Sequence, residues 1–195
     1  MTAGQGDDVS VESVIRGLVV DVPDFPAPGV LFRDLTPVFA DPTGFRRMVE
    51  GLTAGSDGDP RAAAVGATAD DPGFDVVVGV EARGFLLAAA VALRNGVGVV
   101  PVRKAGKLPR ERIAVDYALE YGTATLELHA DALRPGQRVL LVDDVLATGG
   151  TLAASVALVE QLGAVVTAVS VVIELAALGG RARIEPHAVH ALWVT

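Results

Sequence analysis

Two adjacent carboxylates followed by a loop of small residues form the segment with the clearest chemical potential. Asp143 and Asp144 follow the apolar run 139–142, and a helix-like stretch begins a few residues later. The loop that leads from the carboxylates into this helix-like stretch consists of Ala147, Thr148, Gly149, Gly150 and Thr151. Glycines let backbone amides approach an anion, threonines add hydroxyl donors, and a helix N-terminus adds N–H donors with a partial positive charge. The loop therefore has the features of a phosphate monoester site.

The two carboxylates need partners other than phosphate, because like charges repel and carboxylates accept hydrogen bonds from hydroxyl groups or bind cations. A sugar phosphate meets both needs, with its phosphate in the loop and its ribose hydroxyls on Asp143 and Asp144. The alternative is a strand-to-helix turn capped by Asp and Thr, although capping needs only one such residue. The segment lacks the Gly-Lys-Ser/Thr ending of a triphosphate P-loop and the G-x-G-x-x-G pattern.

Two further segments bring positive charge. Arg83 and Gly84 follow the apolar run 76–80, so we expect them at the same sheet edge as Asp143, where Arg83 can bind phosphate oxygens in a bidentate way. The alternative for Arg83 is an ordinary helix start with an exposed side chain. A basic run also occurs in this acidic chain, and its members are Arg103, Lys104, Lys107, Arg110 and Arg112.

The basic run has three interpretations. It can capture pyrophosphate and its magnesium complex, it can be a solvated positive loop, or it can bind RNA. The third is disfavoured because no aromatic residues are interleaved for base stacking.

The elements that must position these residues are short apolar strands alternating with helices. Apolar runs at 76–80, 97–102, 139–142 and 164–173 suit strands covered on both faces, as in parallel sheets. Helical patterns lie at 11–18, 43–52, 84–95 and 151–162, with Gly96 and Gly163 as C-terminal stops. The alternation predicts an α/β fold. Residues 54–73 are small, polar and acidic, and we expect a surface insertion there.

Composition narrows the functional classes. The chain has 195 residues, 51% of them hydrophobic, with a net charge of −8 and no cysteine. This favours a single folded domain and disfavours broad nucleic-acid binding, disulfides and thiolate chemistry. The polar N-terminus is unlike a signal peptide, and apolar stretches such as 85–93 are shorter than the roughly 18 residues of a membrane span. We expect a cytoplasmic protein with no membrane partner and no nucleic-acid partner.

The segment 139–151 resembles the phosphoribosyl pyrophosphate (PRPP) motif of type I phosphoribosyltransferases. Residues 23–34, 80–85, 102–109 and 117–122 narrow the resemblance to members that act on adenine. It implies a central, mainly parallel sheet flanked by helices, with a small N-terminal hood (about residues 1–40). It also implies a homodimer and a flexible catalytic loop at about residues 103–122. The implied reaction is purine salvage, in which adenine and PRPP give AMP and pyrophosphate.

The resemblance also implies roles for individual residues. Asp143 and Asp144 orient the ribose, residues 147–151 hold the 5′-phosphate, and Arg83 binds pyrophosphate in a loop with a cis peptide near 81–82. Arg103 and Lys107 reach PRPP bound in the neighbouring subunit. Glu120 shuttles the proton of the purine, and Tyr121 supports the loop. Adenine lies at Phe32, with main-chain groups near Leu31 and Arg33 reading its edge.

Magnesium is expected to enter bound to PRPP, since it retains waters and binds substrate phosphates readily. No metal site built by the protein is expected, because His187 and His190 lack a further ligand pattern nearby. Two alternatives to the adenine reaction stay open. One is the same chemistry on another purine base, and the other is a regulator that binds PRPP without catalysis.

Overall fold

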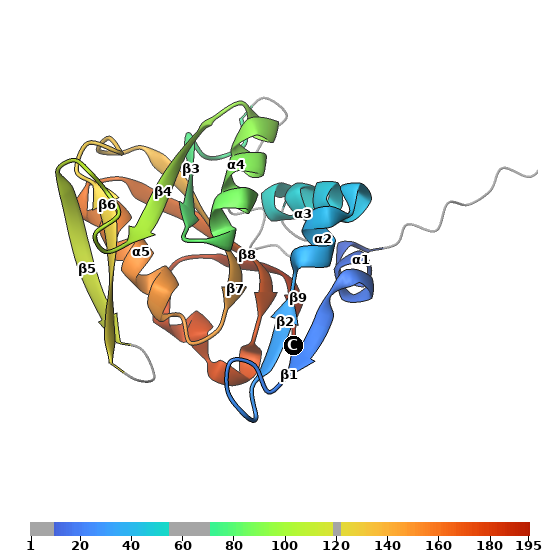
Figure 1. The fold of residues 1–195 in the computed structure, drawn as a ribbon. Helices are drawn as coiled ribbons and strands as arrows, with labels where there is room; N and C mark the ends of the chain where they lie inside the picture. Colours follow the sequence, from blue (N-terminus) through green and yellow to red (C-terminus); the bar gives the residue numbers. More distant parts are fainter. Residues whose placement is uncertain (1–9, 55–70, 119–121) are drawn as a thin grey trace, which may run out of the picture. The chain divides into compact units, whose positions relative to one another are not determined.

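A computed structural model of the chain describes residues 10–54, 71–118 and 122–195 (Figure 1). The chain divides into two compact units, Met1–Gly51 and Leu52–Thr195. Its helices are α1 (Val11–Leu18), α2 (Thr36–Ala40), α3 (Pro42–Ala54), α4 (Arg83–Asn95) and α5 (Gly150–Gln161), with short 3-10 turns η2 (Ala176–Leu178) and η3 (Gly180–Arg183). Its strands are β1 (Val20–Pro23), β2 (Leu31–Asp34), β3 (Val76–Val80), β4 (Gly98–Lys104), β5 (Arg112–Ala118), β6 (Thr123–His129), β7 (Arg138–Leu146), β8 (Val165–Glu174) and β9 (Val189–Val194).

The first unit consists of α1, a two-stranded sheet, α2 and most of α3. Ser10 caps α1, because its Oγ accepts a hydrogen bond from the Ser13 amide at 3.2 Å. Strands β1 and β2 pair antiparallel. In the turn between them, the Asp24 carboxylate accepts a hydrogen bond from the Gly29 amide at 2.7 Å, and the Phe25–Pro26 bond is cis. The hydrogen bond between Gly29 and Asp24 orders the proline-rich turn between β1 and β2.

The second unit is built on a seven-stranded sheet in the order β5-β6-β4-β3-β7-β8-β9. Strands β4, β3, β7, β8 and β9 run parallel, whereas β5 and β6 form an antiparallel hairpin attached beside β4. The predicted α/β fold with a mainly parallel sheet is confirmed. No helix in the described part of the chain has the length and apolar character that crossing a bilayer requires.

The two long helices of this unit cover opposite faces of the sheet. The crossover β3-α4-β4 and the crossover β7-α5-β8 step in opposite directions along the sheet, so right-handed connections place α4 and α5 on different sides. On the α4 side the approach is close: a Cβ atom on Gly79 would lie only 2.6 Å from the Cβ of Ala88. Glycine at this position of β3 lets α4 pack directly against the backbone of the sheet.

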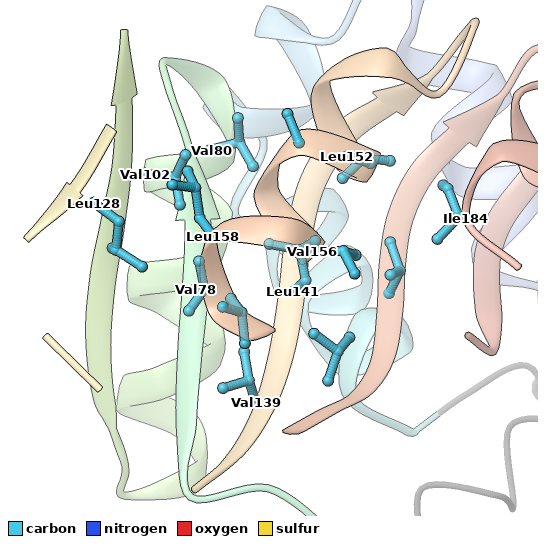
Figure 2. Packing of buried hydrophobic residues seen from close by; sticks show 14 of the residues in the cluster. Val78, Val80, Val102, Leu128, Val139, Leu141, Leu152, Val156, Leu158 and Ile184 are labelled. Carbon is cyan, nitrogen blue, oxygen red and sulfur yellow. The ribbon is translucent and has the colours of Figure 1, made fainter. Parts of the chain in front are cut away.

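The core on the α5 side is a continuous apolar cluster (Figure 2). Alternate residues of β3 and β7, such as Val78 and Leu141, meet Leu152, Val156 and Leu158 of α5. Full burial of each such side chain stabilises the fold by about 1.5–3 kcal/mol. This core fixes β7 and the start of α5 relative to each other, which positions the loop between them.

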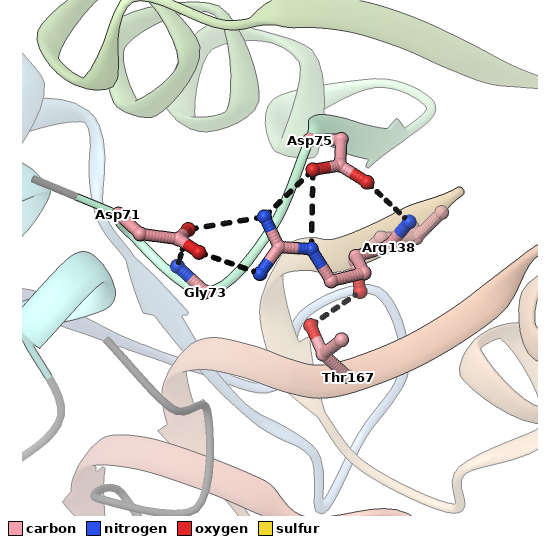
Figure 3. A network of polar contacts seen from close by, with 6 residues as sticks. Asp71, Gly73, Asp75, Arg138 and Thr167 are labelled. Atoms are coloured by element: carbon pink, nitrogen blue, oxygen red, sulfur yellow. Dashed lines mark hydrogen bonds and ion pairs between the residues drawn. The ribbon is translucent and has the colours of Figure 1, made fainter. Parts of the chain in front are cut away.

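A polar cluster closes the opposite end of β7 (Figure 3). Arg138, the first residue of β7, donates hydrogen bonds to the Asp71 carboxylate at 2.9 and 3.0 Å and to Asp75 Oδ1 at 2.7 and 3.1 Å. The Arg138 amide also donates to Asp75 Oδ2 at 2.9 Å. We call these three residues the Arg138 cluster. Hydrogen bonds from Arg138 lower the pKa of both Asp71 and Asp75.

The predicted strands and helices of the sheet unit are all present, with shifted ends. β4 extends to Lys104 instead of residue 102, and α3 extends over Pro42–Ala54 rather than 43–52. Most of the predicted surface insertion at 54–73 lies outside the described residues. Its described end includes Asp71, which belongs to the Arg138 cluster.

Candidate active site

The acid pair lies inside β7, close to its carboxyl end. Only 8% of Asp143 and 7% of Asp144 is exposed. The pair lies near the end of a buried strand, as predicted, but the strand extends further: residues 143–146 continue the pairing with β8, up to Leu146 opposite Glu174. The pair is therefore held by the sheet rather than by a loop. The Asp144 amide donates a hydrogen bond to Asp143 Oδ1 at 2.9 Å.

One cation lies against the acid pair. Arg83, the first residue of α4, places its Nη2 atom 2.6 Å from Asp144 Oδ2. Burial raises the pKa of Asp143 well above its ordinary value, and the negative charge of Asp144 acts in the same direction. A hydroxyl donor or a cation that reached the pair would favour its ionised form, so this arrangement is suited to binding a polyol.

Gly84 makes the short distance between α4 and the acid pair possible. A Cβ atom at this position would lie 2.9 Å from Asp143 Oδ1 and 3.0 Å from the carbonyl oxygen of Val142. Any side chain there would displace either the acid or the helix. The predicted placement of Arg83 and Gly84 beside Asp143 is confirmed by these contacts.

The loop 147–151 follows β7 and opens α5. Gly149 has a left-handed backbone (φ 80°) and immediately precedes the helix, and no side chain of the described residues caps that helix start. The first amides of α5 are thus available for an anion. A cavity of about 80 Å³ lies here. It is lined by Asp143, Val145, Leu146, Ala147, Thr148, Gly149, Gly150, Thr151 and Leu152.

The two basic residues singled out from the sequence converge on Glu81. Lys107 forms an ion pair and hydrogen bond with the Glu81 carboxylate, and Arg103 Nε lies 3.5 Å from it. The Lys104 amide donates to it at 3.0 Å. Burial would raise the pKa of Glu81, but the hydrogen bonds from Lys107 and Lys104 and the nearby positive charges lower it below its ordinary value. The expected cis peptide is present between Glu81 and Ala82.

Glu81 is a residue that the sequence reasoning missed as a partner of the basic run. The available signal was its position, next to a strand end and two residues before Arg83. The other two arginines of the run bind elsewhere, Arg110 to Asp131 at 2.6 Å and Arg112 to Glu127 at 2.9 Å. In the structure, Arg103 and Lys107 thus share the partner Glu81, whereas Arg110 and Arg112 each bind a different carboxylate.

Much of the segment predicted as a loop over 103–122 is strand. β5 pairs with β6 along its whole length, and its residues alternate between exposed and half-buried positions. Ile113, Val115 and Tyr117 face the core, which explains why this stretch forms a strand. β5 ends beside the phosphate loop: a Cβ atom on Gly150 would lie 3.3 Å from the carbonyl oxygen of Ala118. Glu120 and Tyr121 lie outside the described residues.

The residues predicted to contact a base lie together on one strand of the first unit. Leu31, Phe32 and Arg33 all belong to β2. The Phe32 ring meets the Phe25 ring edge to face, with centroids 5.1 Å apart, and Arg33 Nε lies 3.7 Å from Asp21 Oδ1. Leu31 and Phe25 are exposed, so an apolar surface is available on this strand and its preceding turn.

No group of three potential metal ligands converges within residues 10–54, 71–118 and 122–195. Of the histidines considered from the sequence, His187 lies 3.2 Å from Glu160 Oε1, and His190 is buried on β9.

Comparison with known proteins adds to this geometry. The phosphoribosyl transferase domain matches residues 62–191. The adenine phosphoribosyltransferase of Salinispora arenicola is 54% identical over 183 residues, covering 94% of this chain and 90% of the relative. That of Clavibacter sepedonicus is 55% identical over 185 residues, covering 95% and 89%.

Solved structures show the same relationship. Adenine phosphoribosyltransferase from Thermoanaerobacter pseudethanolicus superposes with a TM-score of 0.84 at 42% identity, covering 95% of this chain and 100% of that chain. The Saccharomyces cerevisiae enzyme, solved with an imino-altritol bisphosphate and adenine, gives a TM-score of 0.83 at 37% identity, covering 93% and 98%.

Proposed function

The chain belongs to the phosphoribosyl transferase domain family, and from that premise we propose that it transfers the 5-phosphoribosyl group of PRPP to adenine, giving AMP and pyrophosphate. Relatives more than half identical to it are adenine phosphoribosyltransferases. The observation in the structure that carries the proposal is the buried pair Asp143–Asp144 next to the loop 147–151, because this combination suits a ribose and its phosphate.

The acid pair acts on the ribose. Asp143 and Asp144 accept hydrogen bonds from the ribose hydroxyls, and their charge balances the positive charge that develops at C1 as pyrophosphate leaves. Amides and hydroxyls of Ala147, Thr148, Gly149, Gly150 and Thr151 hold the 5′-phosphate. With both ends of the sugar phosphate fixed, C1 is presented to the incoming base in a constant position.

Positive side chains bind the pyrophosphate. Arg83, Arg103 and Lys107 supply this charge, and the structure pairs them with Asp144 and Glu81. Substrate binding would exchange these carboxylates for phosphate oxygens. Magnesium enters with PRPP as part of the substrate, since it binds phosphate oxygens and one or two carboxylates while keeping several waters. Oxygen atoms of the acid pair fit that preference.

The base lies at the aromatic and main-chain surface of β2. Phe32 stacks on adenine, and main-chain groups near Leu31 and Arg33 read its edge. Glu120 moves the proton that leaves the purine as the bond to C1 forms, and Tyr121 supports the loop.

The chain acts as a cytoplasmic homodimer in this proposal, with residues 1–40 as a hood over the base. The basic residues Arg103 and Lys107 serve the PRPP site of the neighbouring subunit. Mixing an Asp144→Asn protein with a Lys107→Ala protein checks this: partial recovery of activity in the mixed dimer is expected, since one of its two sites then combines intact groups. No recovery would place Lys107 in the site of its own chain.

The reaction itself is tested by incubating the protein with Mg²⁺, PRPP and each nucleobase in turn, and measuring the nucleotide and pyrophosphate formed. AMP from adenine alone is the expected result. A different nucleotide would keep the chemistry but overturn the assignment of the base surface on β2. PRPP binding without any product would favour a regulator that senses PRPP.

A further inference from the structure

Gly180, far from the acid pair in sequence, presses against the phosphate loop. A Cβ atom on Gly180 would lie 2.1 Å from the carbonyl oxygen of Ala147 and 2.7 Å from the Gly149 amide nitrogen. In return, a Cβ atom on Gly149 would lie 2.4 Å from the carbonyl oxygen of Gly180. The two backbone segments are in direct contact, and neither Gly149 nor Gly180 has space for a side chain. The position of Gly180 therefore limits the conformations that the loop can adopt.

The residue after Gly180 is held by three hydrogen bonds. Arg181 Nε donates to Glu174 Oε1 at 3.0 Å, Arg181 Nη2 donates to Glu174 Oε2, and Arg181 Nη1 donates to the carbonyl oxygen of Val189 at 2.7 Å. A planar guanidinium that spans both oxygens of a carboxylate fixes direction as well as distance. Arg181 therefore ties Gly180 to the last residue of β8 and to the first residue of β9.

Glu174 is itself attached to the start of the phosphate loop. It is the last residue of β8, it pairs with Leu146 across the sheet, and its side chain is only 7% exposed. The next amide, that of Leu175, donates to the carbonyl oxygen of Leu146 at 2.8 Å. Leu146 directly precedes Ala147. These contacts form a closed chain. The phosphate loop contacts Gly180, Arg181 binds Glu174, and Glu174 pairs with the end of β7, from which the loop begins.

We propose that Glu174 and Arg181 are positioning residues for the phosphate loop, which they hold in shape through Gly180. This inference rests on the proposed function, because it assumes that residues 147–151 bind the 5′-phosphate. The reason for such a device lies in the loop itself, whose donors are backbone amides. Backbone amides bind a phosphate well only if they are preorganised, that is, already oriented toward its site before binding. No side chain of the described residues caps the start of α5, which presents these amides. Glu174 is buried but the Arg181 side chain is 37% exposed, and such an ion pair contributes little net stability, so a geometric role explains it better.

The direct test is Arg181→Lys, which keeps the charge but cannot span both oxygens of Glu174 and reach Val189. We expect KM for PRPP and Kd for ribose 5-phosphate to rise about tenfold to a hundredfold, with KM for adenine unchanged. Glu174→Gln should act in the same direction. Ribose 5-phosphate is the useful probe because it carries the phosphate and the hydroxyls without pyrophosphate.

Arg138→Lys is the matched control, since it makes the same substitution in an arginine that also bridges carboxylates, at the other end of β7. It should lower thermal stability without changing either KM. If Arg181→Lys and Arg138→Lys alter the two KM values alike, or if Arg181→Lys affects adenine as much as PRPP, Arg181 is only a structural residue and the inference is overturned.

Gly180→Ala provides a second test should the Arg181 variants fail to fold. The added methyl group must displace Ala147 or Gly149 without touching the ion pair, so the same selective loss of ribose 5-phosphate binding is expected. Unchanged binding by this variant would overturn the inference. Failure of the proposed function is a separate outcome: the wild-type protein would then form no AMP, whereas a failed inference leaves wild-type activity intact.

Discussion

Each end of strand β7 has one arginine and two aspartates beside it, but the aspartates at the two ends have different surroundings. At the amino end, Arg138 satisfies Asp71 and Asp75 with four side-chain hydrogen bonds at an accessible surface. At the carboxyl end, Arg83 contacts Asp144 at 2.6 Å, while Asp143 is buried beside a second negative charge. Hydrogen bonds lower the pKa of the first pair, whereas burial raises that of Asp143.

The difference shows how charge composition alone fails to distinguish structure from function. In the Arg138 cluster, the guanidinium donates hydrogen bonds to both carboxylates, so their charges are compensated without a ligand. The acid pair Asp143–Asp144 is buried with less cationic compensation, and such an arrangement persists where a substrate completes it. Substitutions at the two ends should therefore have opposite consequences.

The largest expected effect is on turnover at the carboxyl end. Asp144→Asn should lower kcat about 10²- to 10³-fold, because it removes charge that balances the developing cation at C1. Initial rates of AMP formation at saturating substrate measure this, with circular dichroism to establish that the fold is intact. Asp75→Asn removes the same charge at the amino end and should leave kcat unchanged. Equal losses in both variants would erase the distinction between the two ends.

The next effect concerns substrate selectivity. Lys107→Ala should raise KM for PRPP about tenfold or more while leaving KM for adenine unchanged, since a charge-assisted contact to pyrophosphate is lost. Arg138→Ala, which also removes one surface cation, should change neither KM. Steady-state kinetics with each substrate varied in turn give the answer, and an equal rise in both KM values would mean that the basic segment acts only as a lid.

A smaller effect is expected on stability, where removing a charge from the acid pair should stabilise the fold rather than impair the protein. Asp143→Asn should raise the free energy of unfolding at neutral pH, since it removes a buried ionisable group and retains an acceptor for the Asp144 amide. Because the folded pKa of Asp143 is raised, its carboxyl favours the fold below the unfolded pKa of about 3.9 and loses that contribution as pH rises through the folded pKa. The gain should thus disappear in acid. Urea unfolding at pH 7 and in acid measures it, and destabilisation at pH 7 would contradict the reasoning.

The smallest effect is the pH response of the Arg138 cluster. The folded pKa values of Asp71 and Asp75 are lowered, so their contribution is present above about pH 3.9 and is lost as pH falls through the folded values. Arg138→Ala should modestly lower the thermal midpoint at neutral pH and make no difference in strong acid. Melting curves across this range compare the two proteins, and a deficit that persisted in acid would assign Arg138 a role other than pairing with these carboxylates.

Much of the fold could be predicted because its central strands contain runs that are apolar at every position. The runs at 76–80 and 139–142 identified β3 and β7, and the glycines at 96 and 163 marked helix ends correctly. β5 was missed because the family resemblance implied a flexible loop over 103–122, although Ile113, Val115 and Tyr117 alternate as in a half-buried strand. The extension of β7 beyond the acid pair was missed since adjacent acids are unusual in a buried strand, and only pairing with β8 explains it.

The candidate site was predictable where its chemistry is local in sequence. Asp143, Asp144 and residues 147–151 are contiguous, and Arg83 follows a recognisable strand. Glu81 and Gly180 depend on contacts between distant segments: Glu81 meets Lys107, and Gly180 meets Ala147. Glu81 could have been singled out by its position at a strand end, but in neither case do the surrounding residues identify the distant partner.

The position of β5 at the edge of the sheet has a consequence for aggregation. An edge strand exposes unpaired amides and carbonyls to any other strand that approaches it. The outward-facing positions of β5 include Arg112 and Asp116, and Asp116 accepts a hydrogen bond from Thr125 at 2.5 Å. Charged side chains on an edge discourage further strands from adding to it. Replacing the exposed Asp116 with valine, while Arg112 stays paired with the buried Glu127, would make this edge a better template for fibre-like association.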